Sequence, residues 1–213
     1  MRERGSNPLF MINMKKTIKL SDIAEIRLGM AFKSAIKEDF LTGSCYLIQT
    51  KDITPDDKID LNNLIKVQPE IHISHHSLSY GNILLRLRGP VFSAAIFESA
   101  SDLPVVTTNQ TAVIICDRLE VSPHFLLWYI NSNIGQRYFS EVSEGTNINK
   151  ISAKIIGDMP IELPSRMDQE RIANINQTWL QQKYTYKKLI ENGDTLFNQI
   201  CNKIQQDKFR HEQ

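Results

Sequence analysis

The sequence predicts an α+β fold, in which a mixed globular domain is followed by one long C-terminal helix. Through residue 167, short apolar runs alternate with turns rich in Gly, Pro and Asp, as in a domain of short strands and helices. From residue 168 to 206 there is no proline and a single glycine, and apolar residues recur at steps of three and four. These patterns divide the chain into a disordered tail (1–16), a globular domain (17–167) and a helical arm (168–208).

Composition narrows the class of protein. The 41% apolar content is that of a globular chain, and no apolar run approaches the ~18 residues of a membrane span. Residues 21–167 carry thirteen Lys and Arg against seventeen Asp and Glu, a balance that opposes DNA binding on average. Any DNA contact must therefore come from a local basic surface. The three cysteines form no CxxC pair, which indicates a reduced, cytoplasmic protein without zinc.

The elements of the globular domain follow in order. Residues 20–26 are predicted to form a short helix or turn that packs Ile23 and Ile26 against the domain. Residues 29–34 are predicted to form a loop. Residues 54–57 (Thr-Pro-Asp-Asp) form a turn, because Pro and Asp favour turn conformations. The apolar, β-branched runs predict strands at 45–49, 83–88, 91–97 and 111–116.

Helices and one extended segment complete the domain. Ser122 and Pro123 suit the cap and first position of a helix over 124–134, which Gly135 ends or interrupts. A shorter helix begins at 151–152. Residues 159–164 are extended, because proline disfavours helix at the residue before it.

The C-terminal segment predicts a helix of roughly 58 Å with a heptad seam that has gaps at Gln182, Gly193 and Lys203. Such a helix cannot bury its apolar stripe on its own small domain, so it needs a partner along most of its length. Aromatic residues on the seam could stack on nucleic acid, but packing is the commoner role. The expected dimer or partner interface consists of Ile172, Ile175, Trp179, Tyr186, Leu189, Leu196 and Ile200.

Several segments together resemble a known family. They are LSDIAEI at 20–26 with Gly29 and Phe32, GNILLRLRG at 81–89, FLLWYINS at 125–132 with GQ at 135–136, residues 148–151, MPI at 159–161 with LP at 163–164, and QERIA at 169–173. In this order, and followed by a long helix, they resemble the specificity subunit of type I restriction–modification enzymes. The resemblance covers roughly residues 20–175.

The resemblance implies sequence-specific recognition of double-stranded DNA without catalysis. The family's usual subunit has two target-recognition domains, each reading one half of a split site, spaced by two antiparallel helices. This chain has one domain and one helix, so the resemblance implies a half-length subunit that forms a homodimer. The implied partners are a methyltransferase (modification) subunit and a motor-nuclease (restriction) subunit. The alternative is a protein-interaction module that acts through its coiled-coil helix and binds no DNA.

Arg86 and Arg88 are the first candidates for DNA contact. In a strand they share one face, where they can reach phosphates or guanine, or instead pair with acids on the sheet surface. The other candidates lie in polar loops, where Asn and Gln can read adenine and Lys can neutralise phosphate, although turns and solvated lysines explain the same residues. They are Lys33, Ser34, Lys51, Asn109, Gln110, Thr146, Asn147, Asn149 and Lys150.

Other chemistry has little support in the sequence. His72 and His76 would share a helix face, but no Glu of the HExxH kind lies between them, so we expect no metal site. Ser93 and Ser99 lack the context of a hydrolase nucleophile. Without a glycine-rich phosphate loop, the chain is expected to bind neither ATP nor a methyl donor, and no cofactor is predicted.

Overall fold

The computed structural model describes residues 16–211 apart from 34, 55, 71 and 144–149, and side chains from 17 to 206 outside those gaps. The chain divides into two compact units, Met1–Ala173 (unit 1) and Asn174–Gln213 (unit 2). The tail expected at 1–16 lies outside the described residues except for the backbone of Lys16.

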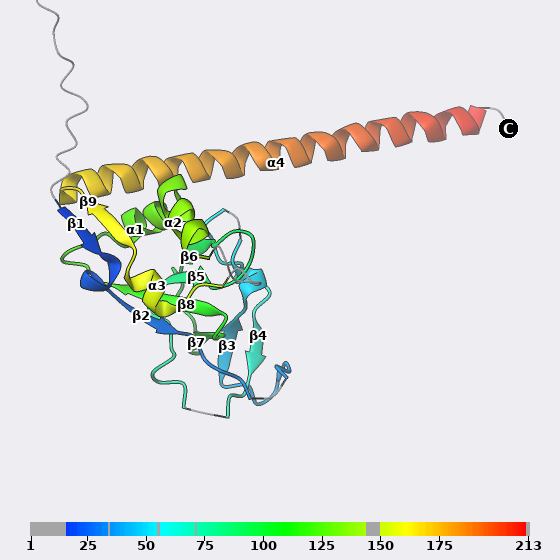
Figure 1. Cartoon of the computed structure of the whole chain (residues 1–213). Helices are drawn as coiled ribbons and strands as arrows, with labels where there is room; N and C mark the ends of the chain where they lie inside the picture. Colours follow the sequence, from blue (N-terminus) through cyan, green and yellow to red (C-terminus); the bar gives the residue numbers. More distant parts are fainter. Residues whose placement is uncertain (1–15, 34, 55, 71, 144–149, 212–213) are drawn as a thin grey trace, which may run out of the picture. The chain divides into compact units, whose positions relative to one another are not determined.

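The larger sheet of unit 1 has the strand order β2-β8-β5-β6 and is antiparallel throughout (Figure 1). Its strands are β2 (Ala24–Leu28), β8 (Thr111–Cys116), β5 (Ile83–Arg86) and β6 (Ala94–Ile96). The first four residues of β8 and the first three of β5 are buried. Both faces of this sheet are therefore covered, which explains the unbroken apolar runs in the two central strands.

A second sheet has the order β4-β3-β7, with β4 at Ile65–Val67, β3 at Cys45–Ile48 and β7 at Val105–Thr107. Strands β3 and β7 are parallel, and β3 and β4 are antiparallel. A separate ribbon pairs β1 (Lys16–Lys19) with β9 (Pro160–Leu163), so the first described strand of unit 1 lies beside its last one.

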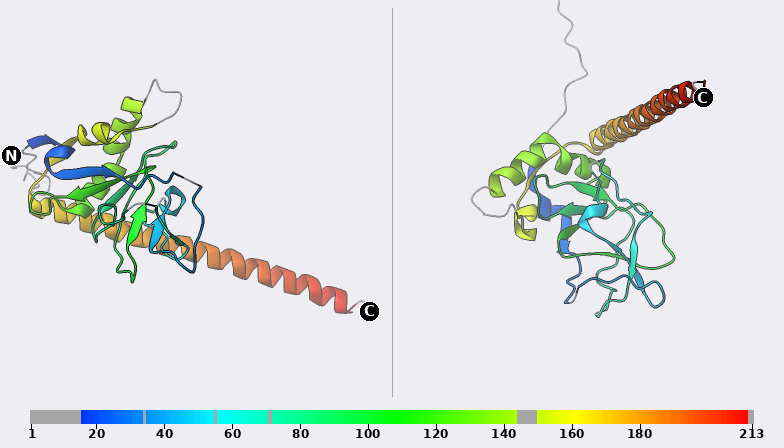
Figure 2. Two further views of the ribbon diagram at one scale, coloured as in Figure 1. Left: turned by 90° about the horizontal axis from the view of Figure 1, so that it is seen from below. Right: turned by 90° about the vertical axis from the view of Figure 1, so that its right-hand side faces the viewer.

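Helices cover one face of the larger sheet and the second sheet covers the other (Figures 1 and 2). The helices are α1 (Pro123–Asn131), α2 (Asn133–Ser143) and α3 (Ala153–Gly157). On the helix side, Ile83, Leu85 and Ile114 share a buried cluster with Phe125 and Phe139. On the other side, Leu84 and Val113 share a cluster with residues of the second sheet, among them Ile48 and Val105. Alternate residues of β5 and β8 thus belong to different cores.

Strands are present in all four predicted segments, and Pro160–Leu163 is extended as expected. The interpretation of residues 20–26 is wrong in its second half. A 3₁₀ turn spans Leu20–Asp22 (η2), but Ala24–Leu28 is a strand because it pairs with β8. Ile23 is buried as predicted, and Ile26 is half-buried.

The helix expected over 124–134 is in fact two helices that separate at Ser132. Gly135 does not end the first helix but lies in the first turn of α2. A Cβ there would come within 2.3 Å of the Ile130 carbonyl oxygen, so glycine permits the two helices to approach. Ser122 precedes α1 without a capping hydrogen bond from its side chain. The shorter helix, α3, is capped by Ser152, whose Oγ accepts a hydrogen bond from the Ile155 N–H.

The last helix, α4, runs from Arg166 to His211 without interruption. Its first turns belong to unit 1, where Gln169 is buried. The Gln169 Oε1 accepts the Ser122 N–H at 2.9 Å, and its Nε2 donates to the carbonyl oxygens of Pro164 and Glu120. The Gln169 side chain therefore links the start of α4 by hydrogen bonds to the loop before α1 and to the residue after β9.

No helix within the described part of the chain has the length and apolar character needed to cross a membrane.

Candidate nucleic-acid interface

Several strands of unit 1 end in one region, and that region holds most of the candidate DNA-contacting residues. The link from β7 to β8, residues 108–110, passes from the second sheet to the larger one. The Gln110 carbonyl accepts the Leu87 N–H at 3.0 Å, just beyond the end of β5. The Asn109 N–H donates to the Met30 carbonyl at 2.8 Å, just beyond the end of β2. We call this region the strand-end surface: Phe32, Lys33, Gln49, Thr50, Lys51, Arg86, Arg88, Thr108, Asn109, Gln110 and Lys150.

The backbone of the 108–110 link is held on several sides. The Thr111 N–H donates to the Thr108 carbonyl at 3.0 Å, which closes the turn. The Thr107 Oγ1 donates to the Ile48 carbonyl at 3.0 Å and joins β7 to β3. Gly29 fits directly against the link, because a Cβ at this position would lie 2.3 Å from the Thr108 carbonyl oxygen. Only glycine allows the loop after β2 to approach so closely.

The side chains of Asn109 and Gln110, in contrast, are exposed. Neither amide makes a hydrogen bond to another described residue. Thr107 and Thr108, directly before them in the chain, are buried, so the two amides are the part of this polar segment that an external partner can reach. Because the backbone is already held, binding a partner would cost the conformational entropy of the two side chains but little of the backbone's.

Arg86 and Arg88 point away from the helix-side core, as their alternation with buried Leu85 and Leu87 predicts. β5 ends at Arg86, and Arg88 forms an isolated bridge with Lys150. Neither arginine forms an ion pair with a described acid. The alternative role, pairing with acids on the sheet surface, is therefore not seen among the described residues. The Arg86 Nε is buried without a described hydrogen-bond partner.

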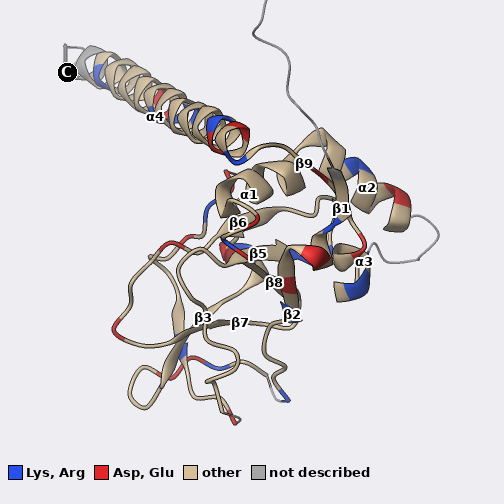
Figure 3. Ribbon diagram, turned by 90° about the vertical axis from the view of Figure 1, so that its left-hand side faces the viewer, with Lys and Arg blue, Asp and Glu red and all other residues tan. Residues whose placement is uncertain are grey.

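The lysines complete the basic part of this surface. Lys33, Lys51 and Lys150 are exposed, and Lys51 lies in a 3₁₀ turn (η3, Thr50–Asp52) and not in the loop expected for it. Four other candidates lie outside the described residues: Ser34, Thr146, Asn147 and Asn149. Over unit 1 as a whole, Lys and Arg are scattered among Asp and Glu (Figure 3).

A hollow of about 450 Å³ lies within the strand-end surface, which we call the strand-end pocket. Gln49 and Thr50, just after β3, form part of its wall, and residues 108–110 form another part. The sequence analysis missed Gln49 and Thr50, which are the last residue of the predicted strand 45–49 and the residue after it. The described lining consists of Phe32, Ala35, Ile36, Gln49, Thr50, Thr108, Asn109 and Gln110.

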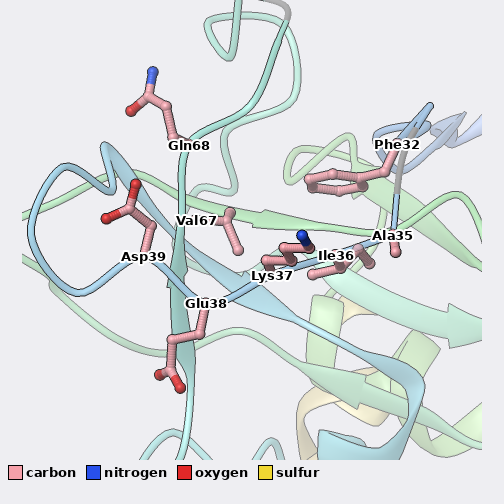
Figure 4. A pocket seen from close by; sticks show the side chains of 8 residues that line it. All are labelled: Phe32, Ala35, Ile36, Lys37, Glu38, Asp39, Val67 and Gln68. Atoms are coloured by element: carbon pink, nitrogen blue, oxygen red, sulfur yellow. The ribbon is translucent and has the colours of Figure 1, made fainter.

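A second hollow, of about 600 Å³, shares Phe32, Ala35 and Ile36 with the strand-end pocket. Figure 4 shows Phe32, Ile36 and Lys37 on one side of it and Glu38, Asp39 and Gln68 on the other. Its lining includes two acids and one base, whereas the described lining of the strand-end pocket carries no charge. The loop after β2 thus separates a charged hollow from a neutral one.

The histidines do not form a helix face. The segment from Ser74 to His76 is a turn, and no group of three or more potential metal ligands occurs among the described residues. Burial, and then the nearby charge of Arg27, lower the pKa of His76.

The other candidate surface is the apolar face of α4. Ile175, Trp179, Tyr186, Leu189, Leu196 and Ile200 are 50 to 71% exposed. Ile172 differs from these six, because it is half-buried against the helix-side core of unit 1. The sequence analysis missed Ile190, Phe197 and Ile204, which are also exposed and widen the face toward the C-terminus.

Comparisons with known proteins identify a matching family model, a curated relative and solved structures of similar fold. Residues 12–192 match the family model described as the type I restriction modification DNA specificity domain. The chain is 25% identical over 196 residues to the type I restriction enzyme MjaIX specificity subunit of Methanocaldococcus jannaschii, a match over 91% of this chain and 42% of that protein. The chain therefore spans less than half the length of this curated relative.

Two solved structures share the fold. One comes from a study of complex assembly and conformational transition in the type I R-M system, with a TM-score of 0.61, 18% identity, and coverage of 81% of this chain and 40% of that one. The other is the HsdS subunit from Thermoanaerobacter tengcongensis, with a TM-score of 0.54, 17% identity, and coverage of 79% and 37%. They share the mixed α+β architecture predicted from the sequence.

Proposed function

Because the chain belongs to the family of the type I restriction modification DNA specificity domain, we propose that it recognises a specific sequence in double-stranded DNA. Unit 1 reads one half of a split site, with residues 17–167 as the reading domain and 168–208 as the helical arm. The chain itself carries out no catalysis. It works in the cytoplasm with a methyltransferase subunit and a motor-nuclease subunit, which perform the chemistry.

The observation that carries this proposal is the strand-end surface. Free amides at Asn109 and Gln110 lie beside Arg86 and Arg88, whose charges have no described partner. Amides can read base edges, and arginines can position the protein on phosphates. Since five strands begin or end here, the reading groups are held by a rigid scaffold.

The charge of unit 1 sets a limit on affinity. With seventeen acids against thirteen bases in residues 21–167, the isolated chain is expected to bind DNA weakly. The partner subunits would supply the remaining positive surface. DNA binding should therefore be measured on the assembled complex and not on the isolated chain.

We propose further that two copies of the chain associate through the exposed apolar face of α4. A helix whose large apolar side chains are at least half exposed gains stability by burying them. A self-complementary face closes as a two-fold dimer, which would place two reading domains on one DNA.

The deciding experiment is a map of methylated bases in cells that carry the methyltransferase subunit, with and without this gene. We expect one split, methylated sequence to disappear when the gene is deleted. A palindromic split sequence would support the homodimer, since two identical domains read identical halves. An unchanged map, with an active methyltransferase subunit present, would refute the proposed function.

A further inference from the structure

The strand-end pocket has no charge among the described residues that line it. Guanine is most often read by Arg or Lys, and cytosine by Asp or Glu, because their donors and acceptors match the edges of these bases. The described lining contains none of these four residue types. The lining therefore lacks the side chains that most often read a G·C pair.

The groups that do line the pocket match the other base pair. Asn and Gln amides donate to N7 and accept from N6 of adenine, and the lining has three such amides, from Gln49, Asn109 and Gln110. Thymine differs from cytosine in its C5-methyl group, which apolar side chains contact. Phe32 and Ala35 belong to the same hollow and provide such a contact.

The pocket is also prepared for binding. Hydrogen bonds to Met30 and Leu87 hold the backbone of Asn109 and Gln110. The Asp52 Oδ2 accepts the Gln49 N–H at 2.8 Å and orders the part of the wall that follows β3. Asp52 itself is buried, so its charge is directed to the backbone and not into the hollow.

We propose that the strand-end pocket reads an A·T base pair in the major groove, so that the recognised half-site contains A·T at one fixed position. The amide of Asn109 binds adenine, with Gln110 and Gln49 on either side of it. Phe32 and Ala35 contact the thymine methyl group. This inference rests on the proposed function and adds the residues and the base pair to it.

The test uses the full chain in complex with its methyltransferase subunit and a library of duplexes with randomised sequence. Bound duplexes are sequenced for the natural chain and for Asn109→Ala, Asn109→Asp and Gln110→Ala. Asn109→Asp is nearly isosteric, so it changes the hydrogen-bonding pattern with little risk to folding. Asn133→Ala removes an exposed amide from α2, outside the pocket, and serves as the matched control.

We expect the natural chain to select a sequence with a fixed A·T pair. Asn109→Ala should lower discrimination at that one position by about 5- to 150-fold and leave the other positions unchanged. Asn109→Asp should abolish the adenine preference and favour cytosine, whose N4 amino group donates to a carboxylate. Asn133→Ala should select the natural sequence.

Three results would overturn the inference in different ways. If all variants at Asn109 and Gln110 melt like the natural chain and select the same sequence, the pocket does not read bases, and the proposed function stands. If the relaxed position is a G·C pair, the assignment to A·T is wrong. If the natural complex selects no sequence at all, the proposed function fails and the inference fails with it.

Discussion

Units 1 and 2 differ in where their stability comes from. Unit 1 has cores on both faces of its larger sheet, and its last buried apolar residue is Ala173. No described side chain of unit 2 is buried, although Ile175, Leu189 and Phe197 are large and apolar. A domain that buries its own core folds alone, whereas a helix gains most of its stability from packing. This difference is the reason for the proposal that unit 2 packs against a second copy of the chain.

The largest expected effect is the loss of association when charges are placed on the apolar face of α4. In the double variant Leu189→Asp, Leu196→Asp, each copy loses two leucines that the proposed dimer would bury and gains two unpaired charges. We expect the dimer dissociation constant to rise at least about a thousandfold, equivalent to about 4 kcal/mol. Light scattering of the full chain would then show a monomer.

The matched control is Asn198→Asp, Asn202→Asp. Both asparagines are exposed, and Asn198 is two residues beyond Leu196, on nearly the opposite side of the helix. This control should remain dimeric. A Leu189→Asp, Leu196→Asp chain that is still a dimer would exclude this face as the interface.

Cysteine reactivity gives the next largest contrast between the units. Burial raises the pKa of the Cys45 thiol to about 11 and that of the Cys116 thiol to about 12, so both remain protonated thiols near neutral pH. Cys201 in unit 2 is exposed. At pH 8, iodoacetamide should label Cys201 more than about a hundredfold faster than the other two.

Mass spectrometry of peptides after a short exposure would give the labelled positions. Cys201→Ser should remove the fast label, and denaturation should expose all three thiols of the natural chain. Fast labelling of Cys45 in the native chain would show that unit 1 opens far more readily than its burial indicates.

A smaller effect is expected where α4 joins unit 1. Gln169→Ala leaves the Ser122 N–H buried without its acceptor and removes the bonds to Glu120 and Pro164. The cost is about 2–3 kcal/mol, which corresponds to a fall in Tm of about 4–10 °C. Calorimetry or thermal circular dichroism measures it. Gln181→Ala, at an exposed position of unit 2, should change Tm by less than about 1 °C. If the two variants lowered Tm equally, the hydrogen bonds of Gln169 would not stabilise the junction between α4 and the rest of unit 1.

The smallest expected effect concerns a surface of unit 1 that we assign to binding and not to stability. The double variant Arg86→Ala, Arg88→Ala should weaken binding of the complex to its DNA site by about tenfold and reduce the salt dependence of binding. Its Tm should stay nearly unchanged, since neither arginine has a described ion-pair partner. Arg137→Ala, on α2, is the matched control. A large fall in Tm would instead indicate a structural role for the arginine pair.

Local patterns were sufficient for much of the fold. Strand β8 coincides with the predicted run 111–116, because a β-branched segment between turns has few alternatives. The start of α3 was predicted to within two residues, and α4 was predicted from its three-four periodicity. In contrast, residues 24–26 have no strand signal of their own and extend because β8 lies beside them.

The candidate site was predictable only in part. Asn109 and Gln110 stood out as a polar turn between apolar runs, and Arg86 and Arg88 as charges at the end of a strand. Gln49 and Thr50 were missed because nothing near them in the sequence shows that β3 pairs in parallel with β7. That pairing brings the end of β3 to the 108–110 link, some sixty residues later in the chain.

The sequence by itself determined the class of fold, the long helix with its unpaired apolar face, and most strands, since these depend on residues within a few positions of each other. The tertiary structure alone decided which of the scattered polar residues lie together. Pairing of β3 with β7, and the close approach of Gly29 to Thr108, brought Phe32, Gln49 and Asn109 around one neutral hollow. Contacts between residues so far apart are set by packing of the whole domain, which no local pattern records.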